Sequence, residues 1–89
     1  MIHKIKDITL DLSKLKNVYP ASVVEYNSQI SEMSLEWTDM NEGKVKVLRY
    51  ILVFDFIPQE EDKRDTTTID FDTKDELIQE MIKVSKLLL

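Results

Sequence analysis

The clearest pattern of apolar and polar positions lies at the C-terminal end of the chain. One apolar stripe recurs at helical spacing and comprises Leu77, Ile78, Met81, Ile82, Val84, Leu88 and Leu89. Thr73 and Glu76 fit a capping box, in which each side chain bonds the backbone N–H of the other residue. Acids come first and lysines last, as the helix dipole favours. The pattern predicts a helix over 74–88 that packs on a core.

A long run of β-branched, aromatic and aliphatic residues over 44–57 predicts a strand, since no helix breaker interrupts it before Pro58. Residues 33–38 alternate between apolar and polar side chains, which predicts a half-buried strand. Gly43 lies between the two segments and is suited to a left-handed turn position. We therefore expect a hairpin over roughly 31–57.

The remaining segments are shorter. Alternation predicts strands within 2–12 and over 66–71, and β-branched residues predict a strand over 22–26, with a short helix from Pro20 as the alternative. Polar composition predicts loops over 13–17 and 59–65.

The predicted fold is α+β: an antiparallel, four- to five-stranded twisted sheet with one C-terminal helix packed on one face, in the order β-β-β-β-β-α. A length of 89 residues supports a single domain over 1–89.

The strand over 44–57 is apolar on both faces, so the hairpin register decides which face is free. The even positions from Leu48 to Phe56 carry large groups and no charge, which predicts the core face. A four-residue loop over 40–43 places Trp37 on this face, whereas a three-residue loop places it opposite Val47. Burying each large side chain contributes about 1.5–3 kcal/mol, which favours the four-residue loop.

That register leaves the odd positions on the opposite face. We predict a partner-binding sheet face made of Val45, Val47, Arg49, Ile51 and Val53. The alternative, which the sequence leaves open, is that the N-terminal strands cover this face.

Charge is concentrated in one segment. The net charge is −5, and residues 55–76 alone carry nine acids and three bases. Such a segment repels nucleic acid and attracts basic protein surfaces, although a solvated loop followed by a helix N-terminus has the same composition. The candidate acidic binding residues are Glu60, Glu61, Asp62, Asp65, Asp70, Asp72 and Asp75.

Candidate chemistry is sparse. The chain has no cysteine, which excludes disulfides and thiolate chemistry and favours a cytoplasmic location. His3 is the only histidine, and we expect it at the surface. Asp70 and Asp72 resemble the start of an EF-hand loop, but Met81 stands where that loop needs its glutamate. We therefore predict no catalytic residue, cofactor or metal site.

These features favour a non-enzymatic interaction protein, a small regulator or accessory subunit, that binds another protein through the sheet face or the acidic segment. One alternative is a small acidic inhibitor of a nucleic-acid-binding protein, and another is a metal-dependent module.

We expect no direct nucleic-acid binding. We also expect no signal peptide, because residues 1–7 contain several charges and no apolar h-region. We expect no membrane span, because no apolar run reaches the length needed. A homodimer through the odd face is expected, with Arg49 pairing with Asp55 across a two-fold axis.

Overall fold

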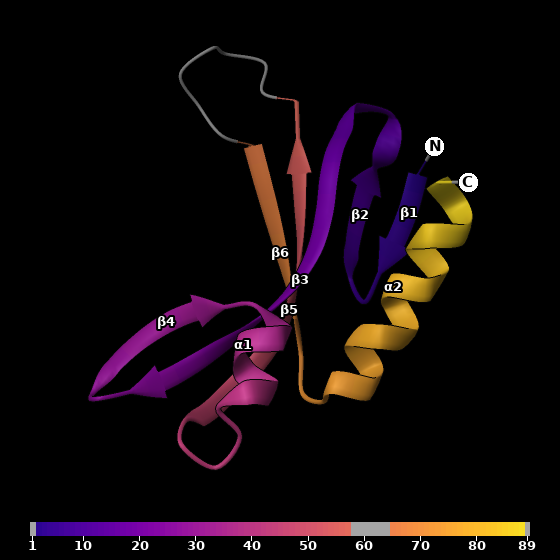
Figure 1. Cartoon of the computed structure of the whole chain (residues 1–89). Helices are drawn as coiled ribbons and strands as arrows, with labels where there is room; N and C mark the ends of the chain where they lie inside the picture. The colour runs from indigo at the N-terminus through magenta and orange to yellow at the C-terminus, as the bar shows by residue number, and fades with distance from the viewer. Residues whose placement is uncertain (1, 58–64, 89) are drawn as a thin grey trace.

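The computed structural model describes residues 2–57 and 65–88, and its elements are shown in Figure 1. Six strands, two α-helices and one 3-10 turn make up this part of the chain. They are β1 (Ile2–Ile5), β2 (Ile8–Asp11), η1 (Leu12–Lys14), β3 (Leu15–Tyr26), β4 (Gln29–Met33), α1 (Leu35–Met40), β5 (Lys46–Phe56), β6 (Asp65–Phe71) and α2 (Lys74–Leu88).

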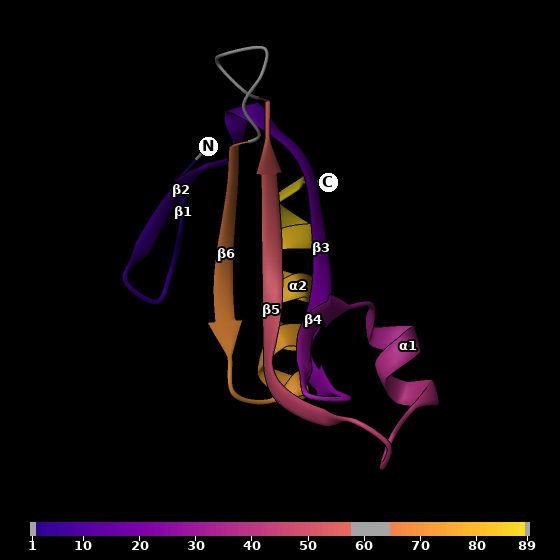
Figure 2. The same cartoon turned by 90° about the vertical axis from the view of Figure 1, so that its left-hand side faces the viewer.

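The strands form two antiparallel sheets. The larger sheet has the strand order β4-β3-β5-β6, and β1 pairs with β2 in a separate hairpin. The long β3 pairs with β4 through its second half and with β5 along nearly its whole length. Helix α2 lies behind the large sheet in Figure 2. The predicted α+β class, with an antiparallel sheet and a C-terminal helix, is confirmed.

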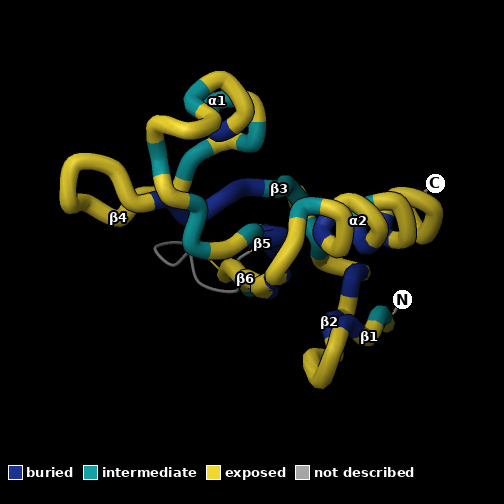
Figure 3. The backbone as a smooth tube through the Cα atoms, turned by 90° about the horizontal axis from the view of Figure 1, so that it is seen from below, coloured by how far each residue is buried: buried dark blue, intermediate teal, exposed yellow. Residues whose placement is uncertain are grey.

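The main core lies between the large sheet, α2 and the β1–β2 hairpin. On β5, Leu52, Phe54 and Phe56 belong to the cluster that contains Leu77 and Val84 of α2, and Tyr50 packs against it. The prediction that the even positions meet the helix is therefore confirmed from Tyr50 to Phe56, whereas Leu48 packs in the other cluster. Ile5 and Leu10 of the hairpin belong to the same buried cluster. Figure 3 shows these buried segments at the centre of the molecule and exposed backbone at both ends.

Helix α2 begins as predicted. The Thr73 hydroxyl accepts a hydrogen bond from the backbone N–H of Glu76 at 3.2 Å. Leu77 and Val84 are buried, whereas Ile78 and Ile82 are 37% and 47% exposed, so the buried stripe is narrower than expected. Leu89 lies outside the described residues. Neither described helix has the length and apolar character needed to cross a membrane.

The prediction of a strand over 33–38 is wrong, because α1 occupies most of this segment. Ser34 caps the helix by accepting from the N–H of Trp37 at 3.1 Å, and the Thr38 hydroxyl donates to the Ser34 carbonyl at 2.9 Å. Leu35 packs against the main core and Thr38 is buried, so the inward positions are three residues apart rather than two.

The predicted hairpin over 31–57 is therefore absent. β5 pairs with β3 and β6 instead. Gly43 has a φ of +84°, so the left-handed glycine is confirmed, but it serves the connection from α1 to β5.

The segment over 13–30 also differs from the prediction. Instead of a loop over 13–17, η1 is followed directly by β3, which extends the strand predicted over 22–26. The β3–β4 turn uses Asn27 and Ser28, both with positive φ, as a two-residue hairpin turn requires. No glycine marks this turn, which is why β4 was missed. The strand predicted over 66–71 is confirmed as β6, and most of the loop predicted over 59–65 lies outside the described residues.

Candidate functional site

A β-bulge divides the predicted sheet face into two parts. Val23 lies opposite Arg49, and the next residue, Val24, lies opposite Val47, so Leu48 is an extra residue on β5. An extra residue reverses the alternation of side chains beyond it. Leu48 therefore packs with Ile51 and Val53 on the face away from α2.

The second part of the predicted face lies elsewhere. Val45 and Val47 line a cleft beside α1 rather than the face that carries Ile51. The prediction that Val45, Val47, Arg49, Ile51 and Val53 share one face is therefore wrong, and the cause is the bulge at Leu48.

The face away from α2 offers little exposed apolar surface. Ile51 and Val53 are each 2% exposed, in a cluster with Ala21 and Val23 of β3. The N-terminal strands do not cover this face, since they pack with α2 into the other cluster. Arg49 approaches Asp70 of the neighbouring strand β6, with 3.6 Å between Nε and Oδ1.

The cleft beside α1 has a volume of about 300 Å³. Its lining residues are Thr38, Asp39, Glu42, Gly43, Val45, Val47, Tyr50 and Lys74. The Lys74 ammonium bonds both carboxylate oxygens of Asp39, at 2.9 and 3.0 Å. This hydrogen bond to Asp39 raises the pKa of Lys74 above its usual 10.5. The ion pair thus joins α1 to the first turn of α2.

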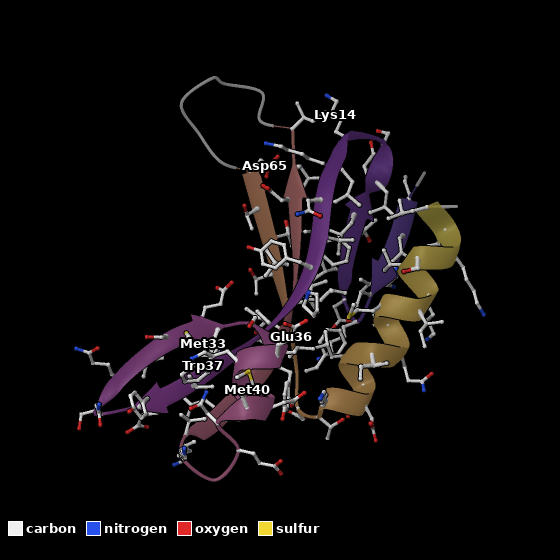
Figure 4. The ribbon with its side chains drawn as sticks, in the orientation of Figure 1. Lys14, Met33, Glu36, Trp37, Met40 and Asp65 are labelled. Atoms are coloured by element: carbon white, nitrogen blue, oxygen red, sulfur yellow. The ribbon has the colours of Figure 1, made fainter. Side chains whose placement is uncertain are left out.

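The structure does not gather the acidic candidates into one patch. Asp65 begins β6 and lines a second cleft, of about 300 Å³, near Lys14 (Figure 4). Asp70 lies near the other end of β6 and on its other face, about 17 Å along the strand. Asp72 and Asp75 are exposed around the start of α2. Glu60, Glu61 and Asp62 lie outside the described residues.

The single histidine is not at a free surface. His3 Nε2 lies 3.2 Å from the Glu80 carboxylate, and the two side chains are 15% and 11% exposed. The contact joins β1 to α2. In the described residues, no cluster of three or more histidine or acidic side chains is placed to hold a metal ion.

A surface that the sequence reasoning missed lies on α1 and the β3–β4 hairpin. Met40 is 81% exposed, and Trp37, three residues earlier on α1, is half-buried. Trp37 meets Tyr26 of β3 edge to face, with ring centroids 6.4 Å apart. Figure 4 shows Met33, Trp37 and Met40 together where β4 leads into α1. We call Tyr26, Met33, Trp37, Met40 and strand β4 the β4–α1 surface.

Strand β4 is also a free edge of the sheet. It pairs with β3 on one side, and no described strand pairs with its other side. Four of its five residues are exposed. In Figures 1 and 3 the hairpin that carries β4 projects away from α2. A helical interpretation of 34–40 would have predicted this surface, because it places Trp37 and Met40 on the face opposite Leu35 and Thr38.

Comparisons of this chain with protein-family models, curated proteins and solved structures found no match. The geometry of the described residues therefore carries the functional argument.

Proposed function

We propose that this chain is a non-enzymatic interaction protein that binds another protein through the β4–α1 surface. The observation that carries the proposal is the exposure of Met40 beside Trp37 and Tyr26 at an unpaired strand edge. Isolated exposed apolar residues are ordinary, but adjacent aromatic and methionine side chains are typical of interface centres. Methionine also adapts its shape to different partners.

The exposure of residues differs between the β4–α1 surface and the sheet face predicted from the sequence, and it favours the β4–α1 surface as the contact. Ile51 and Val53 are already buried within the chain, so covering them with a partner would remove little further apolar area from water. Met40 retains most of its surface, and Tyr26 retains 49% of its own. A partner gains more by covering the β4–α1 surface.

The proposal is tested by affinity capture from lysate of the source cells with matched baits. The wild type is compared with Met40→Glu and with Ile82→Glu, which places the same charge on an exposed apolar position of α2. We expect a protein that the wild type and Ile82→Glu retain and Met40→Glu loses. Equal retention by all three baits, or none by any, contradicts the proposal.

A fourth bait tests the acidic-inhibitor alternative. Asp70→Asn, Asp72→Asn and Asp75→Asn are combined, because these acids are exposed. If this bait loses the captured protein while Met40→Glu retains it, the partner binds through the acidic segment rather than through the β4–α1 surface. The solution mass of the wild type alone separates a homodimer from a monomer that awaits a different partner.

A further inference from the structure

We infer that the partner binds as an added strand along the free edge of β4, with apolar side chains toward α1 and a basic side chain beside Glu32. This inference rests on the proposed function, because it specifies the partner of the β4–α1 surface.

The backbone of β4 favours an extended partner. In an antiparallel pair, alternate residues direct their N–H and C=O groups away from the neighbouring strand. On β4 these outward groups meet no described strand. The sequence Gln29 to Met33 has no proline or lysine, the residues that commonly block such edges. An extended segment adds main-chain hydrogen bonds there, as in other cases of strand addition.

The pairing register assigns each residue of the hairpin to a face. Ser22 lies opposite Met33, and its hydroxyl contacts the Thr38 hydroxyl, so this pair faces α1. Val23 lies opposite Glu32, one residue along, so this pair has the opposite face. Apolar Met33 and acidic Glu32 therefore direct their side chains to different sides of the edge.

An added strand must match both sides. Its residues alternate between the two faces, so every second side chain meets the side that carries Met33 and Trp37. The intervening side chains meet the side that carries Glu32 and Ile30. A segment that alternates between apolar and basic residues fits this arrangement.

The negative charge around β4 and α1 favours a basic partner over a second copy of this chain. Residues 17–43 contain five acids and no lysine or arginine. Asp39 is paired with Lys74, and Glu25 lies opposite Lys46. Glu32, Glu36 and Glu42 form no ion pair with another described residue. Two copies paired edge to edge would place both Glu32 side chains on the same face, where they repel.

The test uses synthetic peptides of about seven residues, long enough to span β4 at about 3.3 Å per residue. The probe alternates isoleucine and lysine. Three control peptides carry the same residues in two blocks, glutamate in place of lysine, or methyl groups on the backbone nitrogens. Binding is followed by emission of Trp37, the only tryptophan, and by hydrogen exchange of the amides over 29–33.

We expect the alternating lysine peptide to bind and to slow exchange in β4, and the three controls to bind far more weakly. Glu32→Lys should weaken binding about fivefold, because a favourable cross-strand charge pair becomes a repulsive one. Asp7→Lys, which changes the net charge equally in the β1–β2 turn, should change binding less than about twofold.

Equal binding of the block or N-methylated peptide would overturn strand addition, as would slower exchange in α1 without any change in β4. Those results would leave the capture experiment with Met40→Glu standing, since it does not depend on the partner's conformation. If the alternating lysine peptide does not bind and the capture experiment with Met40→Glu also fails, both the proposed function and this inference are wrong.

Discussion

At the residue scale, the contact between Ser22 and Thr38 holds α1 on the sheet. Ser22 is fully buried and Thr38 is 6% exposed. The two hydroxyls bond each other, and the Thr38 hydroxyl also reaches the Ser34 carbonyl at 2.9 Å. A buried hydroxyl that loses its partner pays its desolvation cost without compensation. These two short side chains therefore position the helix that carries Trp37 and Met40.

We predict that Thr38→Val lowers the free energy of unfolding by about 1 kcal/mol, because the Ser22 hydroxyl then keeps only its longer hydrogen bond, to the Met33 carbonyl at 3.4 Å. Combining Thr38→Val with Ser22→Ala should cost less than the sum of the two single changes, since the pair is then removed together. Urea unfolding followed by Trp37 emission measures both quantities. Strictly additive losses would show that the hydroxyls do not interact.

The Lys74–Asp39 ion pair gives the fold a dependence on alkaline pH. The hydrogen bond to Asp39 raises the pKa of Lys74 in the folded chain above its usual 10.5. A raised pKa means that the pair stabilises the fold at neutral pH and loses this contribution as pH rises through the folded-state value. The effect is small, because solvent reaches both side chains, which are 37% exposed at Lys74 and 60% exposed at Asp39.

We therefore predict that Lys74→Gln is slightly less stable than the wild type at neutral pH, and that the difference shrinks above pH 10.5 and vanishes once the pH exceeds the raised pKa of Lys74 in the folded chain. Comparing the two proteins at each pH cancels the titration of other groups. Urea midpoints measured across this range provide the check. A difference that grows with pH would contradict the sign of the shift.

At the scale of elements, the spacing of apolar residues was sufficient to predict α2, β5 and β6 from the sequence, because each has many apolar positions and clear ends. It failed for α1, because six residues contain fewer than two helical turns and their polarity alternates by chance. Ser34 was the available helix signal, since serine is a favoured N-cap. The prediction that the odd positions of β5 form one binding face failed for a related reason. The bulge at Leu48 depends on how β5 pairs with β3, and the composition of β5 alone does not encode that pairing.

Because α1 is short, we predict that its cap decides whether it forms. Ser34→Ala should cost about 1 kcal/mol and speed hydrogen exchange of the α1 amides. Ser34→Asp should restore both, since aspartate also accepts from the Trp37 N–H and suits the positive end of the helix dipole. Amide exchange measured by NMR tests this, and unchanged α1 exchange in Ser34→Ala would show that packing alone holds the helix.

At the scale of the whole molecule, the N-terminal hairpin depends on its contact with α2. An isolated two-stranded hairpin is only marginally stable in water. Here Ile5 is 3% exposed within the main core, and the Lys6 ammonium lies 4.7 Å from the Phe71 ring centroid. The His3–Glu80 contact links the hairpin to α2, and the Lys6–Phe71 contact links it to β6. One core therefore joins the two ends of the chain to the large sheet.

Strand β1 offers a matched pair of isoleucines to test this unity. Ile5→Ala removes buried atoms and should lower the free energy of unfolding by about 2–4 kcal/mol, whereas Ile2→Ala, at a position 72% exposed, should cost less than about 0.5 kcal/mol. Trp37 lies in α1, which is far from β1 in the molecule (Figure 1), so its emission reports whether the loss spreads through the molecule. If one core unites the fold, the unfolding transitions of Ile5→Ala followed by Trp37 emission and by far-ultraviolet circular dichroism should report the same loss in the free energy of unfolding. A Trp37 transition that stays at the wild-type midpoint would show instead that the hairpin and α2 unfold apart from the β4–α1 surface.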